Sequence, residues 1–148
     1  EALRPDFKDY IKSVLANAKI LSETLKNNGF KIYSGGTDTH LMLVDLRPFN
    51  VKGNAAAESL SNANITCNKN GIPFDSEKPM ITSGIRLGTQ AATTRGFGLK
   101  EFEKVGELIT KVVKGLSENP DDNSKIEEEV RNEVIELTSN FPIYKNLK

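Results

Sequence analysis

Apolar residues recur at helical spacing near the start of the chain. They follow steps of three and four residues, which place them on one face of an α-helix, and they are Phe7, Ile11, Val14, Ala18, Leu21 and Leu25. Pro5 suits the first position of a helix, and the run Asn27-Asn28-Gly29 supplies a stop signal. We therefore predict a long first helix with one apolar face.

The last third of the chain repeats this pattern twice. Helical spacing links Phe102, Val105, Ile109, Val112 and Leu116, and then Ile126, Val130, Val134 and Leu137. Asn119-Pro120-Asp121 breaks the pattern between the two sets. Because Ser124 and Glu127 have the spacing of a capping box, the last helix is predicted to begin near either Asn119 or Ser124.

The middle of the chain has a different character. Nine of the eleven glycines fall between Gly29 and Gly98, and the apolar runs there are short, at residues 30–33, 41–46 and 81–87. Short aliphatic runs between Gly, Pro and Asn clusters predict strands, and residues 54–63 predict a helix between them. The order β-β-α-β-α-α predicts an α+β fold with a small mixed or antiparallel sheet covered by helices. We treat residues 1–148 as one domain.

Composition narrows the classes of partner and compartment. The 20 basic and 20 acidic residues balance, so no global field favours nucleic acid or an anionic membrane. No apolar run approaches the roughly 20 residues needed to cross a bilayer. The single cysteine, Cys67, cannot form an internal disulfide and suits a reducing compartment, where we interpret it as a small, partly buried apolar residue. We expect a soluble, cytoplasmic protein without nucleic-acid or membrane partners.

One arginine lies in an unusual setting. Arg86 is flanked by Gly84 and Gly88, and glycine lets a backbone approach a ligand closely. A guanidinium group presents paired planar donors that fit a carboxylate. These residues alone leave two interpretations open, an ordinary salt bridge and contact with an anionic ligand.

Three motifs resemble those of one enzyme family, in the same order. They are SGGTDTHLMLVDLRP at residues 34–48, NKNGIPFD at residues 68–75 and TSGIRLGTQAATTRGF at residues 82–97. Together they resemble the C-terminal portion of bacterial serine hydroxymethyltransferases, and the resemblance runs from about Glu1 to Tyr144. It implies the small C-terminal domain of a fold-type-I, aspartate-aminotransferase-like enzyme, in which a large domain holds pyridoxal 5'-phosphate.

The resemblance also implies an activity. Members of the family are transferases of one-carbon metabolism and amino-acid biosynthesis, and interconvert serine plus tetrahydrofolate with glycine plus 5,10-methylenetetrahydrofolate. It implies a homodimer or a higher homo-oligomer. The family's cofactor lysine lies in an upstream motif that these 148 residues lack. We therefore expect a C-terminal piece that is inactive alone and contains no catalytic residue, with residues 1–28 as the helix leading from the large domain of its own chain.

The resemblance assigns roles to individual residues. Arg86 matches the family's arginine that binds the α-carboxylate of serine or glycine. Asn70 matches an asparagine that contacts the pterin ring of tetrahydrofolate, and an amide suits that mixed hydrogen-bonding edge. Glu77, Lys78 and Pro79 align with a segment that lines the folate site, although their composition fits a polar surface turn equally well.

Other polar residues are expected to be structural. Ser83 and Thr89 should support the loop around the arginine, and Arg47 and Arg95 should take part in surface or interdomain pairing. His40 is the only histidine, so we interpret it as a hydrogen-bonded structural residue and expect no metal site.

Two alternatives remain at this point. One is the small domain of another fold-type-I pyridoxal-phosphate enzyme that handles glycine or serine, although a folate-side asparagine in NKNGIPFD would have no use there. The other is a standalone, non-catalytic binding module that reuses this scaffold.

Overall fold

The structure is a computed structural model that describes residues 2–144. Its α-helices are α1 (Pro5–Asn27), α2 (Gly53–Asn62), α3 (Gln90–Arg95), α4 (Leu99–Glu118) and α5 (Ser124–Ser139). Its strands are β1 (Lys31–Ile32), β2 (Leu41–Asp45), β3 (Asn68–Asn70) and β4 (Gly84–Gly88). Two 3-10 helices, η1 (Tyr33–Gly35) and η2 (Arg47–Phe49), precede and follow β2.

The four strands form one sheet in the order β1-β2-β4-β3, and every neighbouring pair is antiparallel. The predicted α+β class is therefore confirmed, with an antiparallel sheet. In the register, Arg86 of β4 lies opposite Leu43 of β2 on one side and Asn68 of β3 on the other. The central strand β4 thus carries Arg86 between two neighbours.

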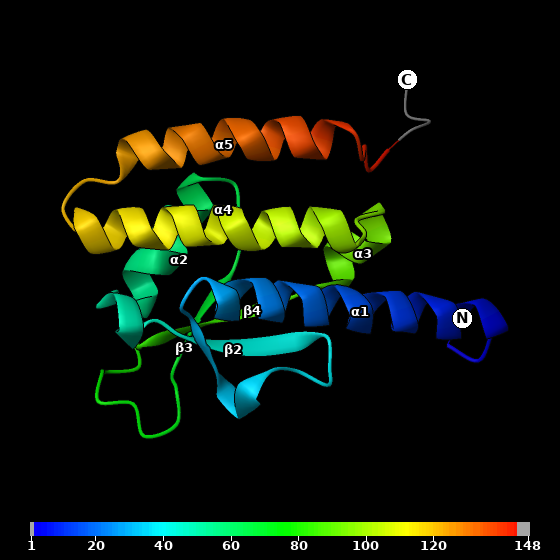
Figure 1. The fold of residues 1–148 in the computed structure, drawn as a ribbon, viewed down its shortest axis with the longest axis horizontal. Helices are drawn as coiled ribbons and strands as arrows, with labels where there is room; N and C mark the ends of the chain where they lie inside the picture. Colours follow the sequence, from blue (N-terminus) through cyan, green and yellow to red (C-terminus); the bar gives the residue numbers. More distant parts are fainter. Residues whose placement is uncertain (1, 145–148) are drawn as a thin grey trace.

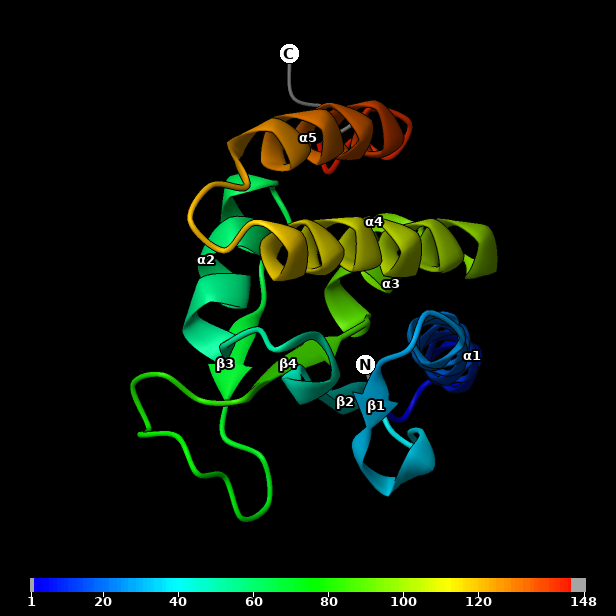
Figure 2. The ribbon, with the colours of Figure 1, turned by 60° about the vertical axis from the view of Figure 1, so that its left-hand side comes forward.

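Helices α1 and α4 pack against each other on one side of the sheet (Figure 1). Helix α5 packs on α4 and lies farther from the sheet than α4 does in both views, while α2 packs beside the edge strand β3 (Figure 2). The strands consequently bury one face, and alternation along β4 buries Ile85 and Leu87 but leaves Arg86 exposed.

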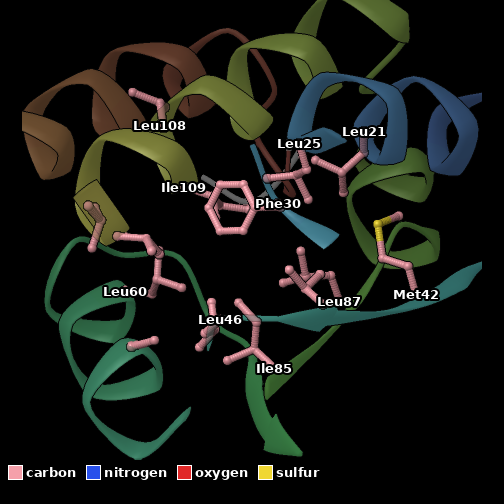
Figure 3. Packing of buried hydrophobic residues seen from close by; sticks show 14 of the residues in the cluster. Leu21, Leu25, Phe30, Met42, Leu46, Leu60, Ile85, Leu87, Leu108 and Ile109 are labelled. Carbon is pink, nitrogen blue, oxygen red and sulfur yellow. The ribbon is translucent and has the colours of Figure 1, made fainter. Parts of the chain in front are cut away.

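The core lies between the sheet and these helices (Figure 3). Strands β2 and β4 contribute Met42, Val44, Ile85 and Leu87. The helices contribute Ala18, Leu21, Leu25, Ala56, Leu60, Phe102, Leu108, Ile109, Val112, Val113, Leu116 and Val130. Most of these helical residues belong to the three periodic sets predicted near the ends of the chain, although Ile11 of the first set is exposed.

The middle of the chain differs from the sequence prediction in several places. Strand β3 was not predicted, because Asn68–Asn70 is polar and gains its strand conformation by pairing with β4 at the sheet edge. The strand predicted over residues 81–87 begins only at Gly84, because Thr82 has a left-handed φ of 63°. The helix α3 and the two 3-10 helices were also missed, and β1 is only two residues long.

Helix α5 begins at Ser124, one of the two predicted starts, but Ser124 does not cap it. The N-cap position is Asn123, whose buried side chain donates hydrogen bonds to Ser59 Oγ and to the Val112 carbonyl instead. The Asp122 carboxylate accepts the Ser124 N–H at 3.0 Å. The predicted capping box is therefore wrong, since its serine already lies in the first turn.

Candidate functional site

Arg86 lies on the face of β4 that points away from the core. Its side chain is exposed, and within residues 2–144 no carboxylate forms an ion pair with it. The salt-bridge interpretation therefore finds no partner in the described part of the chain. An exposed guanidinium on a rigid strand is available to an anion from outside these residues.

The turn that leads into β4 is fixed by the start of α2. The N–H groups of Gly53 and Asn54 donate hydrogen bonds to the carbonyls of Thr82 and Ile81, each at 2.9 Å. These N–H groups would otherwise have no partner, because the first turn of a helix offers none. The Thr82 hydroxyl also donates to the Gly84 carbonyl at 3.1 Å. Helix α2 therefore sets the position from which the arginine strand starts.

Gly84 serves internal packing. A Cβ at this position would lie 2.6 Å from Ile72 Cγ2 and 2.7 Å from the Val44 carbonyl oxygen. The residue is buried, and protein atoms already fill the space beside it. The expectation that this glycine lets a ligand approach the backbone is wrong, because the neighbouring loop and strand require the absence of a side chain.

Asn70 and the proposed folate segment share a surface hollow. Asn70, Glu77 and Pro79 line a hollow of about 440 Å³, whereas Lys78 is exposed and does not line it. The Asn70 amide donates to the Gly71 carbonyl at 2.8 Å. The Glu77 carboxylate already forms an ion pair with Lys52. The negative charge of Glu77 is therefore already balanced by Lys52 before any ligand binds.

Asn70 also connects this hollow to Arg86. Both residues line a second shallow hollow of about 670 Å³, between strands β3 and β4 and helix α2. Lys69 lines both hollows and was not singled out in the sequence. The fold thus places Arg86 and Asn70 on one surface, with Glu77 and Pro79 next to it and Lys78 outside it.

Asp75 is a residue of this region that sequence reasoning missed. Its carboxylate accepts hydrogen bonds from the N–H groups of Ile72, Glu77 and Ser83 and from the Ser83 hydroxyl. Burial alone would raise the pKa of Asp75, but these hydrogen bonds outweigh it and hold the pKa well below its ordinary value. An aspartate in a loop rich in Gly and Pro is a turn signal that could have revealed it.

The supporting role predicted for Ser83 is confirmed, whereas the Thr89 hydroxyl anchors the end of β4 to helix α1 and not to the loop. Ser83 Oγ donates to Asp75 Oδ1 at 2.6 Å, and Thr89 Oγ1 donates to the Val14 carbonyl at 3.0 Å. Both side chains are buried. The carbonyl of the partly buried His40 accepts the Thr89 N–H at 3.1 Å, which joins the start of β2 to the end of β4.

The two other arginines in family motifs have partners within the chain. Arg47 forms an ion pair with Asp45 at 2.7 Å. Burial raises the pKa of Asp45, and the hydrogen bonds from Arg47 more than offset this, so the pKa lies below its ordinary value. Arg95 donates to the carbonyls of Phe141 and Thr138 near the end of α5. Both arginines are therefore engaged, in contrast to Arg86.

Cys67 is expected to react slowly with thiol reagents. Burial raises the pKa of its thiol to about 11, so only about one molecule in a thousand carries the thiolate at pH 8. We expect alkylation on the order of a hundredfold slower than for a free cysteine, with a rate that climbs until about pH 11. Stopped-flow thiol titration of native and urea-unfolded protein checks this, and equal rates in the two states would contradict it.

Residues 2–144 contain no group of three or more His, Cys, Asp or Glu side chains placed to hold a metal ion. None of the helices in this part of the chain combines the length and the apolar character needed to cross a membrane.

Comparisons with known proteins give the family. The family model described as serine hydroxymethyltransferase matches residues 1–109. A serine hydroxymethyltransferase of Pelagibacter ubique is 98% identical over all 148 residues, which make up 34% of its own length. Those of Marinomonas sp. and Paramagnetospirillum magneticum are each 63% identical over 145 residues, again 34% of their length. The chain spans about a third of these relatives, and it belongs to the serine hydroxymethyltransferase family.

Proposed function

We propose that residues 1–148 are the small C-terminal domain of a pyridoxal-phosphate-dependent glycine hydroxymethyltransferase. The whole enzyme interconverts serine plus tetrahydrofolate with glycine plus 5,10-methylenetetrahydrofolate. The observation that carries the proposal is the exposed Arg86, without a carboxylate partner in the described residues and on one surface with Asn70, in a chain of this family. Family membership also favours this enzyme over another glycine- or serine-handling enzyme of the same fold type.

In this proposal Arg86 holds the α-carboxylate of the amino acid. Its planar donors fit the two carboxylate oxygens, which fixes both the position and the rotation of the substrate. Bound pyridoxal phosphate supplies an electron sink for bond cleavage at the α-carbon. By fixing the carboxylate, Arg86 determines which α-carbon bond is aligned for that cleavage.

The described residues do not fit the covalent attachment of pyridoxal phosphate. A lysine that forms such a link is usually desolvated, which lowers its pKa. None of the lysines within residues 2–144 is buried. We therefore propose that the large domain, outside these 148 residues, holds pyridoxal phosphate, and that tetrahydrofolate binds as a co-substrate between the two domains.

The purified 148-residue chain is accordingly expected to bind no stoichiometric pyridoxal phosphate and to turn over no serine. Borohydride reduction followed by peptide mass mapping should find scattered, substoichiometric labelling of exposed lysines such as Lys69. One stoichiometrically labelled lysine together with serine turnover would contradict the assignment of the cofactor to another domain.

We further propose that Asn70 recognises the pterin ring of tetrahydrofolate. Its amide lies at the junction of the two hollows, where it can face both the amino-acid side and the loop of Glu77 and Pro79. The Lys52 ion pair of Glu77 favours a supporting role for this carboxylate. Lys78 is the weakest of the proposed folate contacts, because its side chain lies outside both hollows.

Replacing Asn70 by alanine in the full-length enzyme is expected to weaken tetrahydrofolate binding by about 1–3 kcal/mol, because a buried pterin group loses its partner. Folate-independent aldol cleavage of a β-hydroxy amino acid should persist, since it does not use the pterin. The matched control is Asn62→Ala, whose side chain contacts Glu127 on α5. Parallel loss of both activities in Asn70→Ala would remove the folate role.

We also propose that the full-length protein is a cytoplasmic homodimer or higher homo-oligomer. Large apolar side chains on the surface support contacts with the large domain or with a second copy, and they include Phe74, Met80, Leu99 and Ile135. Light scattering of the full-length protein tests the oligomeric state directly.

A further inference from the structure

One carboxylate in the loop between β3 and β4, residues 71–83, accepts four hydrogen bonds from that loop. Asp75 Oδ2 accepts the N–H groups of Ile72 and Ser83 at 3.1 and 2.9 Å. Asp75 Oδ1 accepts the Glu77 N–H at 3.0 Å and the Ser83 hydroxyl at 2.6 Å. Each oxygen therefore joins one residue of the loop to Ser83, which lies three positions before Arg86.

The backbone beside Asp75 is in a conformation that needs such support. Phe74 and Thr82 have left-handed φ values of 56° and 63°, which are unfavourable for residues other than glycine. The Phe74 side chain is fully exposed, so packing does not compensate for its backbone conformation. Thr82 is supported by hydrogen bonds with Lys78, Gly53 and Gly84. Beside Phe74, the four hydrogen bonds to the Asp75 carboxylate supply the support, because bonds to an ionised acceptor are stronger than neutral ones.

The same loop carries the proposed folate contacts. Asp75 lines the 440 Å³ hollow together with Asn70, Glu77 and Pro79. The Glu77 N–H is one of its four donors, so the carboxylate holds the backbone of a hollow-lining residue directly. A shift of this loop would change the folate hollow while β4, paired on both sides in the sheet, stayed in place.

We propose that Asp75 is a positioning residue for tetrahydrofolate, because its carboxylate locks the folate-side loop to Ser83, the residue directly before the strand that carries Arg86. The inference rests on the proposed function for its ligand, but the locking of the loop is a property of this chain alone. Asp75 itself need not touch the folate. Its replacement should therefore affect folate binding more than amino-acid binding.

The test uses Asp75→Asn in the full-length enzyme. An amide keeps one acceptor oxygen, so two of the four hydrogen bonds lose their acceptor. We expect the Michaelis constant for tetrahydrofolate to rise about tenfold or more, while that for serine and the rate of folate-independent aldol cleavage change less than about twofold. Asp121→Asn, an exposed aspartate in the loop between α4 and α5, is the matched control and should change none of these values.

A measurement without ligand tests the locking of the loop separately from folate binding. Amide hydrogen exchange at Ile72, Glu77 and Ser83 should accelerate in Asp75→Asn, while the amides of Val44 and Leu87 in the sheet stay protected. Ser83→Ala, which removes only the hydroxyl bond, should shift folate binding and loop exchange in the same direction by less. If Asp75→Asn does not fold, Ser83→Ala tests whether the Asp75 hydrogen bonds position the loop for folate.

Each outcome bears on the inference. Unchanged exchange in the loop means that Asp75 does not hold it, and the inference is then wrong whatever the enzyme does. Equal increases in the Michaelis constants for serine and folate mean that Asp75 supports the domain as a whole, which also overturns it. A wild-type enzyme without serine turnover would refute the proposed function, and with it the folate part of the inference, while the exchange data would still test the lock.

Discussion

Replacing Arg86 by lysine in the full-length enzyme is expected to weaken serine and glycine binding by about 2 kcal/mol, the lower end of the range for truncating one partner of a desolvated charge pair. Lysine keeps the positive charge but cannot present two parallel donors to a carboxylate. The binding of pyridoxal phosphate should be unaffected, because no described residue of this chain fits its attachment. Glycine titration followed by the cofactor's absorbance measures both quantities in one sample.

Arg47→Lys is the matched control for this experiment. Arg47 is a second exposed arginine near the sheet, but its guanidinium is already paired with Asp45. Its replacement should leave serine binding within about twofold of wild type, since Arg47 lines neither of the two hollows and already pairs with the buried Asp45. An unchanged Michaelis constant for serine in Arg86→Lys, or the same increase in both variants, would remove Arg86 from the amino-acid site.

The helical parts of the fold could be predicted because their apolar spacing is unambiguous. Leu21 and Leu25 of α1 and Ile109 and Val112 of α4 follow a 3.6-residue period, and all four are buried in the core. The strands were harder to predict because tertiary pairing created them. Asn68–Asn70 has no apolar alternation, and its hydrogen bonds to β4 give it strand conformation.

In the candidate site, too, some features could be predicted from the local sequence and others depend on tertiary contacts. The arginine and asparagine could be singled out from their motifs, because the chemistry of a side chain is visible in its sequence. What positions them was not visible, because it depends on contacts between distant residues. The Gly53 N–H donates to the Thr82 carbonyl, 29 positions away in the sequence. No local sequence pattern predicts a contact of that kind.

Gly84, the first residue of the strand that carries Arg86, provides the strongest test of this packing. Gly84→Ala is expected to lower the free energy of unfolding by about 3 kcal/mol, at the upper end of the usual range for overpacking. The added Cβ would lie 2.7 Å from the Val44 carbonyl oxygen and 3.0 Å from that of Asn70, both backbone atoms of the paired strands. Neither can move without disturbing the sheet, whereas Ile72 Cγ2, at 2.6 Å, could rotate away.

Gly71→Ala is the matched control, because it replaces another glycine of the same region, in the segment NKNGIPFD. Its Cβ would meet nothing closer than Asp75 Oδ2 at 3.8 Å, an ordinary contact. We expect a change of less than about 1 kcal/mol there, against a fall in melting temperature of about 6–12 °C for Gly84→Ala in a domain of this size. Thermal unfolding followed by circular dichroism measures both variants. Similar melting temperatures for the two would mean that the sheet around Gly84 yields easily, and β4 would then be too pliable to hold Arg86 at a fixed place for a carboxylate.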